Sequence, residues 1–336
     1  MAAIVCPANC KIYVFCPGGY ATGGPEALHQ LAHHLNKLGF DACMYYYSTP
    51  KGEEPLHKNY LKYHVPVSAR PENSRKHLMI VPESFLYPIF NKKFSRIKKV
   101  IWWLSVDYYF IELNKHLERL KKKKFYRIRN AFGLFRTATF ERLKEMEIVH
   151  IGHSYYSVVQ LRENGIEPIG QIADYMNDVF LDKYSAAKEN IIIYNPAKND
   201  EFLTGIISET NNLQWKPIAD MSPAEVAGWM SRAKLYIDFG YHPGKERMPR
   251  EACMMSCCMI IGKSGSAAYV EDMPIDEKYR FEKDNTHTPA IIACINDCLS
   301  NYDERINDFK PYRDVVYREK EKFVEDIKKI FVKMPG

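Results

Sequence analysis

Three cationic side chains follow a short apolar segment in the second half of this 336-residue chain. Lys245, Arg247 and Arg250 lie in a glycine- and proline-punctuated loop directly after residues 235–239, which predict a buried strand. Ammonium and guanidinium groups at the carboxyl end of a strand suit a phosphate or diphosphate, because they form charge-assisted hydrogen bonds. The competing interpretation is a solvated loop that only keeps the protein soluble.

Further polar residues follow this loop at short spacing. Glu251 is predicted to open a helix and could accept hydrogen bonds from ribose hydroxyls, as acidic side chains do in dinucleotide folds. A second apolar segment, residues 259–261, leads to a turn in which Gly265 and Ser266 could give backbone and hydroxyl donors to phosphate. This succession of elements predicts an α/β sheet with a ligand site at the carboxyl ends of its strands.

The elements before this region also alternate between strands and helices. Residues 11–16 predict a strand, residues 25–38 an amphipathic helix and residues 41–47 the next strand, which is a βαβ order and calls for a parallel sheet. A nicotinamide-binding fingerprint is disfavoured, because the intervening loop lacks GxGxxG and no acidic residue ends the second strand. A plain strand–helix turn and a ligand-facing loop are both open for its glycines, Gly18, Gly19, Gly23 and Gly24.

Two residues at the ends of other predicted strands are candidates for acid–base chemistry. Asp107 follows the apolar run that begins at residue 98, and His153 follows residues 147–152. Polar residues at these places face the ligand in a doubly wound sheet, and either could deprotonate a hydroxyl. A structural histidine is the alternative for His153. In the second half, a serine–proline–glutamate pattern at residues 222–225 predicts a capped helix start.

Composition limits the class of protein and its compartment. The net charge of +6 favours an anionic ligand or a membrane surface, and no motif points to nucleic acid. Residues 114–130 are strongly basic, which fits either a solvated helix face or contact with anionic lipids, at about 1 kcal/mol per cation. Nine cysteines without zinc-site spacing, no apolar run of membrane length and no expected signal peptide predict a cytoplasmic protein, with peripheral contact at the inner face of a membrane as an extension.

The second-half pattern resembles the donor half of GT-B glycosyltransferases, close to glycosyltransferase family 4. That family has two glutamates separated by seven residues, the second opening a helix that leads to a strand and a glycine turn. Glu251 matches the second glutamate, whereas Pro243 stands in place of the first. The family also grips donor phosphates with an arginine and a lysine in the first loop of this half. Lys198 matches the lysine, and Asn195 stands in place of the arginine.

The resemblance implies a GT-B architecture of two Rossmann-like, doubly wound parallel-sheet domains with an interdomain cleft and a C-terminal crossing helix. An acceptor domain would span residues 1–188 and a nucleotide-sugar donor domain residues 189–314, with residues 315–336 packing back on the first domain. The glycines of the first loop would then face the cleft.

The implied activity is transfer of a sugar from a nucleotide-diphosphate sugar to a glycan, a glycolipid or another hydroxyl acceptor, in polysaccharide or glycoconjugate synthesis. A lipid-linked acceptor belongs to the same expectation. Four cations would stabilise the departing diphosphate, so that no metal and no cofactor is needed: Lys198, Lys245, Arg247 and Arg250. The resemblance implies a retaining course; an inverting one would need a base. The alternatives are a non-catalytic nucleotide- or sugar-binding protein of this fold, and an epimerase or phosphorylase on the same scaffold.

Overall fold

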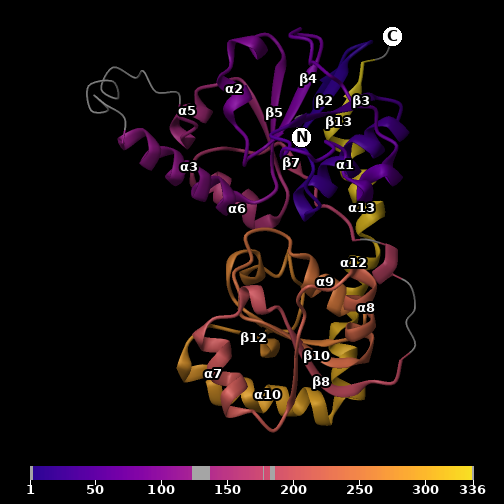
Figure 1. Ribbon diagram of the computed structural model, residues 1–336, viewed down its shortest axis with the longest axis vertical. Helices are drawn as coiled ribbons and strands as arrows, with labels where there is room; N and C mark the ends of the chain where they lie inside the picture. Colours follow the sequence, from indigo (N-terminus) through magenta and orange to yellow (C-terminus); the bar gives the residue numbers. More distant parts are fainter. Residues whose placement is uncertain (1–2, 123–136, 177, 182–185, 335–336) are drawn as a thin grey trace. The chain divides into compact units, whose positions relative to one another are not determined.

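The computed structural model describes residues 3–122, 137–176, 178–181 and 186–334 (Figure 1). The chain divides into two compact units. The first comprises Met1–Asp174 together with Lys322–Gly336, and the second comprises Tyr175–Glu321. Each unit has a main parallel sheet with helices packed against it, so the α/β class predicted from the alternating apolar runs is confirmed.

The first unit is built on a six-stranded parallel sheet with the order β3-β2-β4-β5-β6-β7. Its central strands are apolar on both faces, which is typical of a parallel sheet that helices cover on both sides. The strands are β2 (Lys11–Pro17), β3 (Asp41–Tyr47), β4 (Leu78–Pro82), β5 (Lys98–Trp103), β6 (Ile148–Gly152) and β7 (Gly170–Gln171). The helices are α1 (Gly23–Lys37), η1 (Lys58–Tyr63), α2 (Tyr87–Phe90), η2 (Lys92–Phe94), α3 (Val106–Lys121), α5 (Phe140–Lys144) and α6 (Tyr155–Glu163).

A small second sheet joins the two ends of the chain within the first unit. Strand β1 (Ile4–Cys6) pairs in parallel with β13 (Phe331–Lys333), and Ile4 lies opposite Phe331. Helix α13 (Glu319–Ile330) precedes β13, and its Phe323 ring lies edge-on to His34 of α1 with the ring centroids 5.5 Å apart. This sheet could not be predicted from the sequence, because three-residue strands carry almost no periodic signal.

The second unit is built on a five-stranded parallel sheet with the order β12-β11-β10-β8-β9. Its strands are β8 (Glu189–Tyr194), β9 (Gln214–Pro217), β10 (Ala233–Asp238), β11 (Cys258–Gly262) and β12 (Arg280–Phe281). Its longer helices are α7 (Glu201–Glu209), α8 (Pro223–Arg232), α9 (Arg247–Met254), α10 (Thr288–Ser300) and α12 (Lys310–Tyr317). Its short ones are η3 (Asp178–Phe180), η4 (Pro196–Lys198), η5 (Gly265–Ala268), η6 (Glu277–Tyr279), η7 (Asn285–His287), α11 (Tyr302–Arg305) and η8 (Ile306–Phe309).

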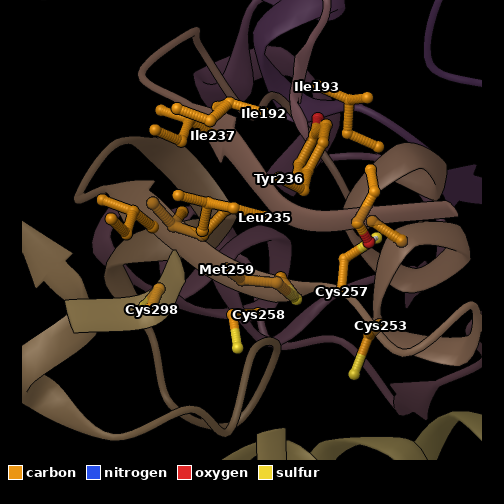
Figure 2. Close-up of a cluster of buried hydrophobic side chains, with 14 of the residues drawn as sticks. Ile192, Ile193, Leu235, Tyr236, Ile237, Cys253, Cys257, Cys258, Met259 and Cys298 are labelled. Carbon is orange, nitrogen blue, oxygen red and sulfur yellow. Dashed lines mark hydrogen bonds between the residues drawn. The ribbon is translucent and has the colours of Figure 1, made fainter. Parts of the chain in front are cut away.

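The core of the second unit lies between its sheet and the helices that pack on it. Figure 2 shows Leu235, Tyr236 and Ile237 of β10 beside apolar side chains of β8 and β11, all fully buried. Cys253 in α9 and Cys257 just after it are buried, and all nine cysteines of the chain are free thiols.

Helix α8 begins where the sequence predicted. Ser222 Oγ accepts a hydrogen bond from the Glu225 backbone N at 3.3 Å, and Glu225 Oε2 accepts one from the Ser222 backbone N at 2.8 Å. Pro223 takes the first helical position, where its missing N–H costs nothing. This reciprocal cap confirms the prediction from the local pattern.

Candidate functional site

Three loops of the second unit meet at the carboxyl edge of its sheet. They follow β8, β10 and β11, which are neighbours in the sheet and parallel, so the loops leave the same edge. The loop after β10 spans residues 239–246 and leads into α9. Five of the residues predicted for donor binding lie in or directly after this loop and the loop after β8: Lys198, Lys245, Arg247, Arg250 and Glu251.

Backbone contacts lock the three loops together. A Cβ on Gly240 would lie 2.5 Å from Lys198 Cβ, so the loops after β8 and β10 touch only because position 240 is glycine. A Cβ on Gly265 would lie 2.0 Å from the His242 carbonyl oxygen, and Gly265 has a φ of +56°. Ser266 donates its backbone N–H to His242 O at 2.8 Å and its hydroxyl to Gly244 O at 2.5 Å. The turn at residues 265–266 therefore holds the loop after β10 in place.

The two lysines of this site are each paired with a carboxylate. Lys198 Nζ lies 2.7 Å from Glu246 Oε2, and Lys245 Nζ lies 2.8 Å from Glu319 Oε1. The Lys198 side chain is 24% exposed and that of Lys245 is 12% exposed, so both ammonium groups lie close to the surface. Arg247 is the first residue of α9 and is half-buried. These cations share one region of the unit, as the sequence predicted.

Arg250 is fully buried, with 0% of its side chain exposed, and its guanidinium bonds to the protein itself. Its Nε donates to Glu246 O at 3.0 Å, its Nη2 to Lys245 O at 3.1 Å and its Nη1 to Glu319 Oε2 at 2.9 Å. The guanidinium thus holds the backbone of Lys245 and Glu246, the two loop residues whose side chains form the ion pairs described above. Such a geometry suits a positioning role for Arg250, where the sequence suggested direct contact with phosphate.

Glu251 does not open α9, contrary to the sequence analysis. The helix begins at Arg247 with Glu246 as the N-cap, so Glu251 lies in its second turn and is half-buried. The sequence suggested a later start because a proline at position 249 is typical of a loop. Proline is tolerated in the first turn of a helix, however, because an N–H there would have no partner within the helix.

A buried carboxylate beneath the loop was not predicted. Asp238, the last residue of β10, accepts hydrogen bonds from Tyr236 Oη at 2.7 Å and from the Gly240 backbone N at 2.8 Å. Burial would raise its pKa, yet His242, Lys198 and Tyr236 together lower the pKa of Asp238 to about 2. His242 Nε2 lies 3.6 Å from Asp238 Oδ1, which is beyond hydrogen-bond distance. A charged Asp238 ties the start of the loop to its strand.

In the first unit, Asp107 and His153 follow the adjacent strands β5 and β6. Asp107 Oδ1 accepts a hydrogen bond from Tyr156 Oη at 2.8 Å. His153 Nε2 accepts one from the Asp174 backbone N at 3.1 Å and lies 3.3 Å from Asp174 Oδ1. Asp107 Oδ2 and His153 Nδ1 are buried and have no hydrogen-bond partner within the described residues.

The first-loop glycines have packing roles that the sequence did not reveal. Gly18 N donates to Tyr47 O and Gly19 N to Pro55 O, both at 2.9 Å. A Cβ on Gly18 would lie 2.3 Å from Thr49 Oγ1, and Gly19 has a φ of +79°. Gly23 and Gly24 form the first turn of α1. The first two glycines therefore allow the segment after β3 to cover the loop.

Other features of the described chain bear on metals and membranes. No group of three or more His, Cys, Asp or Glu side chains is arranged to hold a metal ion among the residues that the structure describes. Over the same ranges, every helix is too short or too polar to cross a lipid bilayer. Of the basic stretch 114–130, residues up to Lys121 lie in α3, and residues 123–130 fall outside the described part of the chain.

Two parallel α/β sheets followed by a C-terminal helix define the GT-B fold, and comparison with solved structures confirms it. The chain is similar to HepE from Anabaena, solved in complex with UDP and glucose, at 12% identity and a TM-score of 0.63, covering 96% of this chain and 100% of that one. It is similar to a glycosyltransferase from Rickettsia africae at 14% identity and a TM-score of 0.64, covering 96% and 98% of the two chains.

Sucrose-phosphate synthase from Thermosynechococcus elongatus is similar at 12% identity and a TM-score of 0.60, again over 96% of this chain and 98% of that one. No family model and no curated protein matches the sequence itself. The likeness to GT-B glycosyltransferases predicted from the residues around Glu251 is thus confirmed in three dimensions. At these identities it establishes the fold, and activity must be argued from the residues.

Proposed function

We propose that this protein is a glycosyltransferase that moves a sugar from a nucleotide-diphosphate sugar to a hydroxyl acceptor. The observation that carries the proposal is the convergence of three loops at one sheet edge, with Lys198 and Lys245 on two of them. Ligands of α/β sheets bind at this edge. The likeness to HepE, whose structure holds UDP-glucose, supports a nucleotide sugar as the donor class.

In the proposed reaction, the bond between the sugar's anomeric carbon and the diphosphate oxygen breaks, and its electron pair leaves with the diphosphate. The acceptor oxygen forms the new bond to the anomeric carbon and passes its proton to an oxygen of the departing diphosphate. Lys198, Lys245 and Arg247 stabilise the negative charge that grows on the leaving group. Because these cations supply the neutralisation, the proposal requires no metal ion.

The other predicted donor-site residues receive supporting roles. Arg250 and Ser266 hold the loop after β10 through its carbonyl oxygens, and Gly265 lets the turn after β11 approach that loop. We assign Glu251 to the ribose hydroxyls. Glu251→Gln should then weaken binding of UDP while leaving 2′,3′-dideoxy-UDP unchanged, and an equal loss for both ligands would remove this assignment.

Asp107 and His153 are the proposed acceptor-side groups. Asp107 Oδ2 and His153 Nδ1 are buried polar atoms without a hydrogen-bond partner among the described residues, so each can bond to an acceptor hydroxyl. The proposed course is retaining and needs no protein base. A product of inverted anomeric configuration, together with loss of transfer in Asp107→Asn, would instead indicate Asp107 as the base.

Binding measurements on two variants test the donor site. Lys198→Ala should weaken UDP binding about tenfold, because a charge-assisted hydrogen bond contributes about 1.5–3 kcal/mol and this side chain is partly solvated. Uridine binding should not change. Lys310→Ala, which removes an exposed lysine of α12 in the same unit, is the matched control. Equal UDP affinity in both variants would contradict the diphosphate assignment.

Turnover separates the enzyme from a non-catalytic binder of the same fold. The purified protein is incubated with labelled UDP-, GDP-, ADP-, CDP- and TDP-sugars, with and without candidate acceptors. The nucleoside diphosphate that is released is then measured. Slow donor hydrolysis or transfer supports the enzyme. Affinity for a nucleotide without any diphosphate release over many hours supports the binder.

A further inference from the structure

A large cavity opens in the first unit, at the carboxyl ends of β4 and β5. It has a volume of about 710 Å³ and lies between the segment that follows β4, helix α2 and one face of α3. A cavity of this size accommodates a small organic molecule. The donor-site proposal makes no use of it.

Two fixed aromatic rings form part of the wall. Phe85 stacks on Tyr47 with the ring centroids 3.5 Å apart and an angle of 8° between the planes. Tyr109 is buried and donates its hydroxyl to Ala138 O at 2.8 Å. Leu113 of α3 lies in the same wall. Because neighbours hold these rings, the cavity keeps an apolar surface that suits a ring or an alkyl chain.

Cations border this apolar wall. Lys92 and Arg119 line the cavity and are exposed, so their charged ends can reach a ligand at its mouth. The acidic residue of α3 in the lining, Glu112, is paired with Lys115 at 2.9 Å. The charge that remains for a ligand is therefore positive.

The second carboxyl of the lining does not oppose an anion. Glu83 is buried, and its Oε2 accepts a hydrogen bond from the Leu104 backbone N at 2.7 Å. Burial raises the pKa of Glu83 to about 8, against which the backbone hydrogen bonds act only in part. Near neutral pH this side chain is mostly protonated and can exchange a hydrogen bond with a hydroxyl.

We propose that this cavity binds an amphipathic organic anion, whose apolar body lies against Phe85 and Leu113 and whose negative group lies beside Lys92 and Arg119. The role of this ligand as the sugar acceptor rests on the proposed function, whereas its binding does not. A free inorganic anion would leave the apolar wall unused, and a neutral hydrocarbon would leave the cations unused.

A pair of fluorescent probes tests the two halves of the proposal. 1-Anilinonaphthalene-8-sulfonate carries the anionic group, and N-phenyl-1-naphthylamine is its neutral counterpart. The double variant Lys92→Gln/Arg119→Gln should bind the sulfonate about tenfold more weakly and the neutral probe equally well, since exposed pairs contribute up to about 1 kcal/mol each. The control Lys51→Gln/Arg96→Gln removes the same charges from exposed sites outside the cavity and should change neither affinity.

Leu113→Trp should weaken both probes by filling the cavity, and the charge variants remain informative if this variant fails to fold. Competition then separates the sources of the anion. Octyl phosphate should displace the sulfonate probe, and octanol or inorganic phosphate at the same concentration should not. Displacement by inorganic phosphate alone, or unchanged probe affinity in every variant, would overturn the proposal.

UDP affinity is measured on the same variants and should not change. If UDP does not bind at all while the probe results hold, the proposed function fails and the anion site stands. If UDP binds and the probe results fail, the anion site is refuted and the proposed function stands.

Discussion

Glu319 is the side chain whose loss we expect to damage the candidate site most. Its two carboxylate oxygens bind Lys245 at 2.8 Å and Arg250 at 2.9 Å, and only 4% of its side chain is exposed. In Glu319→Gln the neutral amide has one oxygen for two cations. Its NH₂ group can only donate, so it must face one of them. One of the two cations thereby loses its contact with a Glu319 carboxylate oxygen.

The expected cost follows from burial. Removing one member of a buried ion pair costs about 3–5 kcal/mol, because the remaining charge cannot return to water. Glu189→Gln supplies the contrast in the same unit: its carboxylate contacts Arg232 at 2.7 Å, but both side chains are 44% exposed. Pairs of that kind contribute about 0–1 kcal/mol. We therefore expect the two variants to differ by about 3 kcal/mol.

Hydrogen exchange followed by mass spectrometry measures this difference locally. Amides of β10 and β11 should exchange on the order of 100-fold faster in Glu319→Gln than in Glu189→Gln, since 1.4 kcal/mol corresponds to about tenfold. Amides of β2 and β4, in the other unit, serve as an internal reference. A difference of less than about threefold between the variants would refute the view that this buried carboxylate anchors the loop after β10.

Two further predictions concern stability. The pKa of Glu83 is raised from 4.5 to about 8, so the folded state holds this proton more tightly than the unfolded state. The resulting contribution to the free energy of unfolding is fully present below pH 4.5 and is lost as the pH rises to about 8, with an upper bound of about 5 kcal/mol. Glu83→Gln should flatten this decline of the urea midpoint between about pH 5 and about pH 8.5, and an unchanged slope would contradict the prediction. Gly265→Ala should cost at least about 2 kcal/mol, because its Cβ would lie 2.0 Å from the His242 carbonyl oxygen, whereas Gly205→Ala on open helix surface should be neutral or stabilising in the same denaturation assay.

Local patterns in the sequence predicted the elements around the candidate site well. The apolar runs at residues 235–239 and 259–261 became β10 and β11, and the run at residues 11–16 became β2. Each run is apolar and is followed by glycine or proline, so neighbours along the chain determine where it ends.

The partners of the site residues could not be predicted in this way. Glu319 lies 69 positions from Arg250, and no periodicity links the two. The same holds for Asp238 beneath its loop: an acidic residue at a strand end indicates a polar site, but not which side chains will surround it. For the same reason the sequence suggested a phosphate contact for Arg250, because it does not show whether a guanidinium is buried or exposed.

The pairing of the lysines has a consequence for the donor proposal. Each lysine of the site is paired with a carboxylate, Lys198 with Glu246 and Lys245 with Glu319. Lys198→Ala removes one cation and also leaves Glu246 without its 2.7 Å partner, facing the proposed phosphate site.

Part of the loss in Lys198→Ala should therefore be repulsion between Glu246 and the diphosphate, beyond the missing hydrogen bond. Adding Glu246→Gln to Lys198→Ala should restore some UDP affinity, while Glu246→Gln alone should leave it equal or stronger. The Glu246 backbone carbonyl, which Arg250 holds, is kept in all three variants, so the loop stays anchored. If the double variant binds UDP no better than Lys198→Ala, then Glu246 does not face the phosphate, and the ammonium of Lys198 serves only to hold its loop.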